Sequence, residues 1–231
     1  MKKFLMLCLV LGAMIAPALA TEGEGFSLGI GLQGNPVRRG EILHPGTGMQ
    51  GGFGLINGGF ALNGWGLGDA KGAYNEQGGF LGYRGDWLEL GFAARGADDR
   101  GTSASGNEAQ LALTSDNGQG GFAELRYILL PGSPDKERWL LAKLGYLGEG
   151  TLADIFAEVQ GNGFQNEAVG RLLHSVELAF GVRVPTKDMS FQFEVHLSRA
   201  AGTKAEELIL QRTEYDHADW NGASAGLVLA F

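Results

Sequence analysis

Residues 175–184 read Ser-Val-Glu-Leu-Ala-Phe-Gly-Val-Arg-Val, and residues 190–199 read Ser-Phe-Gln-Phe-Glu-Val-His-Leu-Ser-Arg. In both stretches every second residue is apolar, and most of the residues between them are small or polar. A period of two is typical of a β-strand with one apolar face, because successive side chains point to opposite faces of a sheet. Each stretch is about ten residues long, which is the length of a tilted strand that crosses a bilayer.

The same alternation recurs along most of the chain and predicts an all-β protein. Eleven strands are expected, at residues 25–33, 49–56, 59–67, 78–84, 87–95, 107–114, 120–129, 138–147, 171–184, 190–199 and 219–231. The connections between them alternate in length. Residues 57–58 and 85–86 form tight turns, whereas residues 35–48, 68–77 and 96–107 form longer polar connections.

Composition excludes several classes of protein. The chain has 40 Gly among 231 residues without a Gly-X-Y period, so it is not collagen, and 44% hydrophobic residues are too many for a disordered chain. Its 18 Lys and Arg against 26 Asp and Glu argue against a nucleic-acid partner, which needs a basic face. The single Cys8 allows neither a disulfide framework nor a thiolate zinc site.

Residues 1–20 have the pattern of a secretory signal peptide. Two lysines precede an apolar run from Phe4 to Ile15, and Ala18-Leu19-Ala20 provides the small residues of a cleavage site. The apolar run is too short to span about 30 Å of hydrocarbon as a helix. We therefore expect cleavage after Ala20, export, and one domain over residues 21–231.

A soluble β-sandwich also alternates, so the end of the chain is informative. Residues 223–231 read Ala-Ser-Ala-Gly-Leu-Val-Leu-Ala-Phe and alternate up to the terminal Phe231. This resembles the C-terminal strand of bacterial outer-membrane β-barrel proteins. The resemblance implies a transmembrane, antiparallel, up-and-down β-barrel in the outer membrane of a Gram-negative bacterium. It also implies contact with outer-membrane lipid and lipopolysaccharide, and recognition of Phe231 by the barrel-assembly machinery.

Bacterial single-chain barrels normally have an even number of strands, so a twelfth strand is expected. Residues 152–160 and 206–213 compete for this place. Thr151-x-x-Asp154 has the form of a helix-capping box, yet a strand at 152–160 leaves residues 185–188 as a short periplasmic turn and 200–218 as a long outer loop. We favour that arrangement. Counts of eight to ten strands are alternatives, because residues 48–67 are rich in glycine.

The inward phase of the later strands carries most of the predicted lumen charges. They are Glu124, Arg126, Lys143, Glu177, Arg183, Glu194 and His196. The N-terminal strands are expected to contribute mainly small residues to the interior. Such a lumen is either plugged by paired charges or open to small solutes, so the sequence predicts a narrow porin-like channel or a structural envelope protein.

A second hypothesis comes from the segment Phe193-Glu-Val-His196-Leu-Ser198-Arg-Ala-Ala-Gly202. It resembles the His-x-Ser-Asn-Ala-Gly stretch of the lipid A 3-O-deacylase family, with Arg199 in place of Asn and one additional Ala. The resemblance implies Ser198 as nucleophile, His196 as base and Glu206 or Glu207 as the residue that orients the base. A third alternative is an exported soluble β-protein. No cofactor or metal is expected, because His44, His174, His196 and His217 have no metal-ligand spacing.

Overall fold

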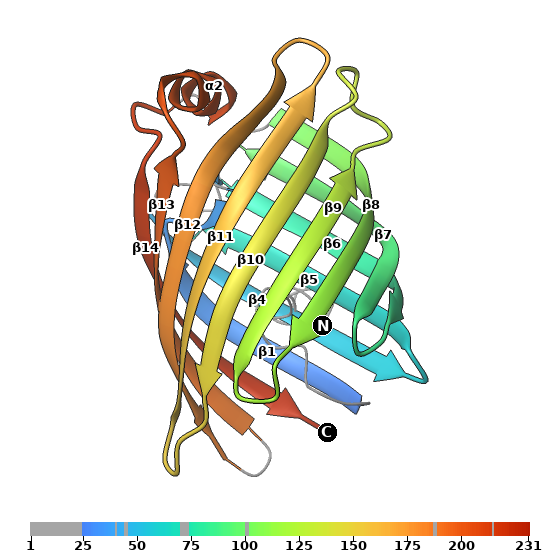
Figure 1. The fold of residues 1–231 in the computed structure, drawn as a ribbon, viewed down its shortest axis with the longest axis vertical. Helices are drawn as coiled ribbons and strands as arrows, with labels where there is room; N and C mark the ends of the chain where they lie inside the picture. The colour runs from blue at the N-terminus through green and yellow to red at the C-terminus, as the bar shows by residue number, and fades with distance from the viewer. Residues whose placement is uncertain are drawn as a thin grey trace, which may run out of the picture.

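The computed structural model describes residues 25–39, 41–43, 46–69, 74–99, 102–186, 189–213 and 215–231. The predicted signal peptide lies outside these ranges. The described residues form a closed barrel of antiparallel strands in up-and-down order (Figure 1). Its twelve strands are β1 (Gly25–Gly34), β4 (Thr47–Asn57), β5 (Phe60–Asp69), β6 (Tyr74–Arg84), β7 (Leu88–Asp99), β8 (Thr102–Asp116), β9 (Gly121–Leu129), β10 (Arg138–Gly148), β11 (Asp154–Asn166), β12 (Gly170–Pro185), β13 (Met189–Ala200) and β14 (Trp220–Ala230). The barrel closes where β1 pairs with β14.

The alternating pattern places its apolar residues on the outer wall, as predicted. Phe193 and Val195 on β13 are more than half exposed, whereas His196 and Ser198 on the same strand are buried inside. An apolar outer wall around a polar interior is the reverse of a soluble protein and is typical of a barrel in a bilayer. Among the described residues, no helix is long and apolar enough to cross a membrane.

Of the two candidates for the twelfth strand, residues 152–160 form it, as we expected. Residues 152–160 fall largely within β11, which pairs along its length with β10 and β12, and residues 206–213 belong to the helix α2 (Thr203–Thr213). The capping-box signal at Thr151 fails because the Asp154 side chain has other partners. It accepts a hydrogen bond from the Gly150 N–H at 3.3 Å and binds the Arg183 guanidinium at 3.0 Å.

The barrel has two different ends. At the turn end, the tight connections 58–59 and 85–87 join neighbouring strands as predicted. At the opposite end, called the loop end, the expected long loops 68–77 and 96–107 are mostly strand. β5 continues to Asp69 and β6 begins at Tyr74, while β7 continues to Asp99 and β8 begins at Thr102. The cross-strand pairing Asp98↔Ser103 accounts for this correction, since polar residues can continue a ladder beyond the apolar band.

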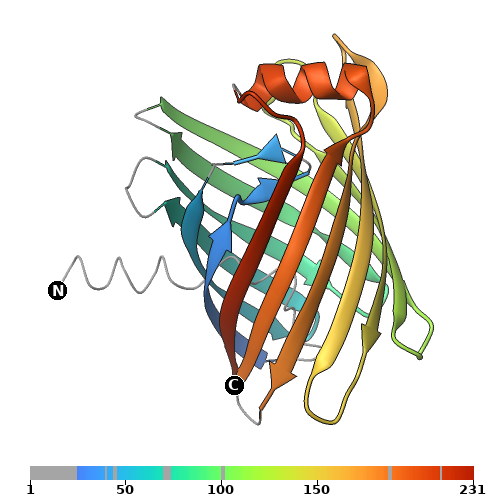
Figure 2. The ribbon, with the colours of Figure 1, turned by 90° about the vertical axis from the view of Figure 1, so that its left-hand side faces the viewer.

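Two further elements occupy the loop end. The connection between β1 and β4 contains a small hairpin of β2 (Val37–Arg38) and β3 (Glu41–Ile42), and α2 lies across this end of the barrel (Figure 2). Ala205, Leu208 and Ile209 form the buried side of α2. Leu208 packs on a cluster of inward side chains, which are Ile128, Trp139, Leu141 and Phe164. α2 thus packs over one side of the loop end, against β12, β13 and β3.

Aromatic rings that lie over glycines explain part of the glycine content. A Cβ atom on Gly145 would lie 2.3 Å from the Phe122 ring, and one on Gly181 would lie 2.2 Å from the Phe156 ring. Each ring belongs to the residue directly opposite on the neighbouring strand. Glycine at these positions lets a large ring lie flat against the sheet. These inward rings fill space beneath the polar part of the lumen.

Candidate functional site

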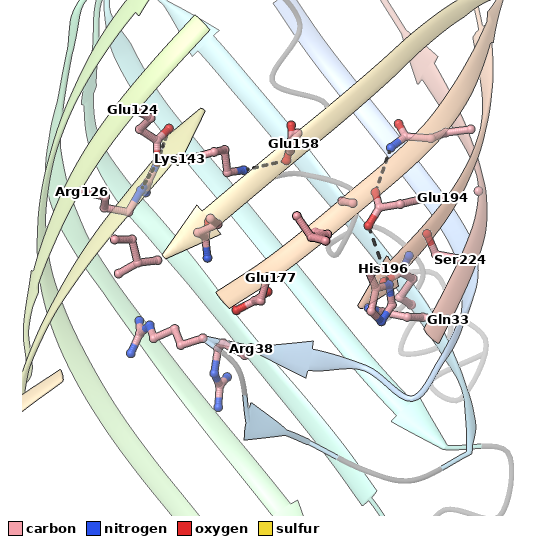
Figure 3. Close-up of a pocket in the computed structure, with 18 of the residues that line it drawn as sticks. Gln33, Arg38, Glu124, Arg126, Lys143, Glu158, Glu177, Glu194, His196 and Ser224 are labelled. Carbon is pink, nitrogen blue, oxygen red and sulfur yellow. Dashed lines mark hydrogen bonds and ion pairs between the residues drawn. The ribbon is translucent and has the colours of Figure 1, made fainter. Parts of the chain in front are cut away.

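A polar cavity of about 410 Å³ lies inside the barrel (Figure 3). Its walls come from β1, β4 and the strands from β8 to β14, and the hairpin β2–β3 contributes Arg38 and Arg39 from the loop end. Six of the seven predicted lumen residues line this cavity, namely Glu124, Arg126, Lys143, Glu177, Glu194 and His196. The seventh, Arg183, does not line it and instead binds Asp154 near the turn end.

Arg126 is the centre of an ion-pair network on one wall. Its guanidinium donates to Glu124 at 3.0 Å, to Glu89 at 2.7 Å and to Gln110 at 2.9 Å. Arg84 donates to the other oxygen of Glu89 at 2.6 Å. Two cations and two carboxylates therefore neutralise one another on β6, β7 and β9. This network narrows the lumen without giving that wall a strong net charge.

The opposite wall, formed by β11, β12 and β13, is more acidic. Lys143 Nζ lies 3.1 Å from Glu158 Oε2, and Glu177 accepts a hydrogen bond from the Asn162 amide. Glu194 lies farther along this wall and has weaker partners. Its carboxylate is 3.5 Å from Gln192 Nε2 and 3.8 Å from His196 Nδ1. Carboxylates that face a water-sized space favour cations there.

Ion pairs hold the hairpin β2–β3 against strands from the N-terminal half of the barrel. Arg38 binds Glu76, whose other oxygen accepts a hydrogen bond from Tyr74 Oη at 2.6 Å. Arg39 donates to Glu108 at 2.5 Å. Glu76, Glu89 and Glu108 are all almost completely buried. The expectation of small residues on the N-terminal wall is therefore wrong for β6, β7 and β8. The inward carboxylates of β6 and β8 bind the arginines of the hairpin, and Glu89 of β7 binds Arg84 and Arg126.

Arg39 also lies over an aromatic side chain. Its Cζ is 5.5 Å from the centre of the Trp139 ring, and Trp139 packs on Phe164 with ring centres 4.9 Å apart. Burial lowers the pKa of Arg39 to about 10, against the opposing charge of Glu108. The guanidinium therefore stays protonated at neutral pH, and its desolvation is only partly offset by its partners.

Glu41 connects the hairpin to the opposite wall and to α2. Its Oε1 accepts a hydrogen bond from Arg212 Nε at 2.6 Å and lies 3.3 Å from His174 Nε2. Burial alone would raise the pKa of Glu41, but the His174 hydrogen bond and the Arg212 charge outweigh it and hold the pKa below its ordinary value. Arg212 also donates to Glu137 at 2.7 Å, so it joins α2, the hairpin and the start of β10.

His174 occupies an irregular position that the sequence pattern does not reveal. The register of β11 and β12 shifts between Asn162 and Gly163, so that Ser175 and Leu173 oppose consecutive residues and His174 is the additional residue of a bulge. Both His174 and Ser175 are fully buried in the interior. Ser175 Oγ lies 3.3 Å from the carbonyl oxygen of Arg39, where it can donate to the hairpin backbone.

The candidate catalytic residues lie in different environments. His196 and Ser198 both point into the barrel from β13, and His196 Nε2 is 3.4 Å from the carbonyl oxygen of Asn35. Glu206 and Glu207 are exposed on α2. The apolar residues of β13 occupy its lipid-facing side. The roles assigned to His196, Ser198 and Glu206 stay predictions.

Comparison with known proteins identifies the fold. No protein-family model matches the sequence, and no curated protein does. Among solved structures, the chain is similar to the KdgM porin, with a TM-score of 0.57, 10% identity, and coverage of 89% of this chain and 99% of that one. For LpxR from Salmonella typhimurium the TM-score is 0.56 at 10% identity, with coverage of 89% and 100%. For the COG4313 outer membrane channel from Pseudomonas putida F1 it is 0.53 at 12% identity, with coverage of 90% and 96%.

These similarities establish the class of the fold. The chain is a closed, twelve-stranded barrel of the type found in bacterial outer-membrane proteins, as the sequence predicted. At 10–12% sequence identity, the similarity shows a shared fold and says nothing of a shared activity.

Proposed function

We propose that this protein is an outer-membrane channel for small polar solutes, whose lumen is narrowed by the hairpin β2–β3. The observation that carries the proposal is the polar cavity of about 410 Å³ in the middle of the barrel, with an acidic wall on β11–β13. A protein that served only as a structural element would gain more stability from apolar or fully paired side chains there. Two of the three similar structures named above are a porin and a channel, which supports the proposal.

The orientation in the membrane follows from the two ends. Outer-membrane barrels have short periplasmic turns and longer extracellular loops, so the loop end with α2 faces outward. Phe231 then lies at the periplasmic end, where the assembly machinery can read it. The lipid-facing wall contacts the acyl chains.

The hairpin is the element whose movement would open the channel. It crosses the lumen from Glu76 and Glu108 on one side to His174 and Arg212 on the other. Because the desolvation of Arg39 is only partly offset, docking of the hairpin is less favourable than its number of ion pairs suggests. We infer that the structure is the narrow state of the channel.

The test is the conductance of the refolded chain in a planar bilayer. We expect small, salt-dependent steps for the wild type and larger steps when residues 37–42 are replaced by a flexible Gly-Ser linker. The control replaces residues 132–135 of the exposed β9–β10 loop in the same way and should leave conductance unchanged. Silence of both wild type and the hairpin variant, with insertion verified by SDS-resistant migration, would refute a channel.

The hydrolase hypothesis has its own test. Replacing Ser198 with Ala while lipid A is followed by mass spectrometry measures whether the side chain is a nucleophile. Because Ser198 is buried on the lumen side, we expect the lipid A profile to be the same in the variant, in the wild type and in cells that lack the protein.

A further inference from the structure

An apolar groove of about 280 Å³ lies on the outer wall, where β13, β14, β1 and β4 meet. Its lining includes Phe191, Phe193, Ala225, Leu227, Leu32 and Met49. The sheet register explains its shape. Ala225 is directly opposite Phe193 on one side and Leu32 on the other, and both neighbours are more than half exposed. A methyl group between two long side chains makes a floor between two walls.

The low floor continues along β14 toward the loop end. Ala223 follows Ala225 on the same face, with Val195 opposite it on β13. Leu197 and then Arg199 complete the outward face of β13. Arg199 lies six residues beyond Phe193, or about 20 Å along the strand. The track thus leads from an apolar groove to a cation at the edge of the apolar band.

The Arg199 guanidinium is positioned by its neighbours and is half exposed. Its Nη1 donates to Asn221 Oδ1 and the Ser198 carbonyl, both at 3.0 Å, and to the Trp220 carbonyl at 3.4 Å. Nε lies 3.6 Å from an oxygen of Asp219, whose other oxygen accepts a hydrogen bond from the Ala200 N–H at 2.9 Å. These contacts orient the guanidinium at the loop end, where 49% of the side chain stays accessible.

We propose that this track binds one acyl chain of lipid A, with a lipid A phosphate on Arg199. The inference assumes the outer-membrane placement above, which puts Arg199 at the outer surface and the groove deeper in the bilayer below it. An acyl chain is the apolar occupant that the bilayer supplies at this face, and a phosphate is complementary to an arginine at the water interface. The length of the track suits a lipid that carries both groups. The ligand is held on the outside of the barrel, so this site is separate from the lumen.

The test is native mass spectrometry of the full mature chain with bisphosphorylated lipid A. Ala225→Phe fills the groove from the lipid side without changing the lumen, and Arg199→Gln removes the cation. The matched controls are Ala94→Phe, at an exposed position on the outward face of β7, and Arg171→Gln, at an exposed arginine of β12. Heat-modifiable migration on a gel verifies that each variant forms a barrel.

We expect Ala225→Phe and Arg199→Gln each to retain about tenfold less lipid A than the wild type, whereas the two controls retain the wild-type amount. Dephosphorylated lipid A should bind the wild type and Arg199→Gln equally weakly. The proposal is overturned if the groove variants retain lipid A like the wild type, or if the controls lose it to the same extent. Equal retention of phosphatidylglycerol by the wild type would overturn lipid A as the ligand.

Discussion

Replacing Glu41 with Gln should loosen the hairpin and increase the time that the channel spends open. Glu41 Oε1 is 2.6 Å from Arg212 Nε, and both side chains are less than a third exposed. Hydrogen bonds between charged groups contribute ~1.5–3 kcal/mol. Glutamine keeps a neutral acceptor and Arg212 keeps Glu137, so we expect a loss of about 1–2 kcal/mol in the docked state. That corresponds to roughly a 5- to 30-fold rise in the ratio of open to closed channels.

The same residue predicts the response to acid. The pKa of Glu41 in the docked hairpin is below its ordinary value of 4.5, so its ionised form stabilises docking. This stabilisation is complete above pH 4.5 and is lost as the pH falls through the lower pKa of the docked state. Open events of the wild type should therefore become more frequent below pH 4.5, and this part of the response should be absent in Glu41→Gln.

Single-channel recording at pH 7 and at stepwise lower pH measures both effects. Glu207→Gln is the matched control, because it makes the same change of charge at an exposed position of α2. The reasoning is refuted if Glu41→Gln has the open probability and pH response of the wild type. It is also refuted if Glu207→Gln reproduces the effect, since the cause would then be net charge at the channel mouth.

Three other variants test the lumen and the barrel. Glu194→Gln should lower the ratio of cation to anion permeability by up to about fivefold, because a carboxylate ~4 Å from a passing ion in water contributes ~1 kcal/mol. The reversal potential in a salt gradient measures this permeability ratio. Trp139→Ala removes a ring that is 2% exposed and should cost ~3–5 kcal/mol, seen as a lower temperature for loss of SDS-resistant migration. Gly120→Ala should reduce the refolding yield more than Gly118→Ala, although both glycines have a positive φ. A Cβ atom at Gly120 would lie 2.0 Å from the Leu147 carbonyl oxygen, whereas one at Gly118 would meet nothing within 4 Å. Equal yields would contradict that clash.

Local patterns identified the strands because the signal for a strand is local. The alternation in residues 175–184 and 190–199 required no knowledge of partners, and it located both β12 and β13. At residues 206–213, however, Leu208 and Leu210 mimic a strand, whereas burial of Ala205, Leu208 and Ile209 selects a helix. That choice depends on the Trp139 cluster beneath α2, which no local pattern contains.

The inward phase placed six of the seven predicted lumen residues at the cavity, because closure of the sheet brings the inward faces of the strands together. It missed Glu76 and Glu108 as ligands of the hairpin, since their partners Arg38 and Arg39 lie in a segment that alternation describes only as a loop. The sequence pattern also did not predict the bulge at His174. A bulge is produced by the pairing of two strands, and neither strand alone encodes its position.

The sequence by itself determined an outer wall of apolar residues, a polar interior and a chain that must close, because an open sheet edge in lipid leaves backbone groups without partners. Tertiary structure alone decided that the segment after β1 folds into the lumen. Its arginines pair with buried carboxylates 38 and 69 residues away in sequence, and α2 holds the hairpin from above. Such pairings depend on which strands become neighbours across the barrel, and that is fixed only when all twelve have closed.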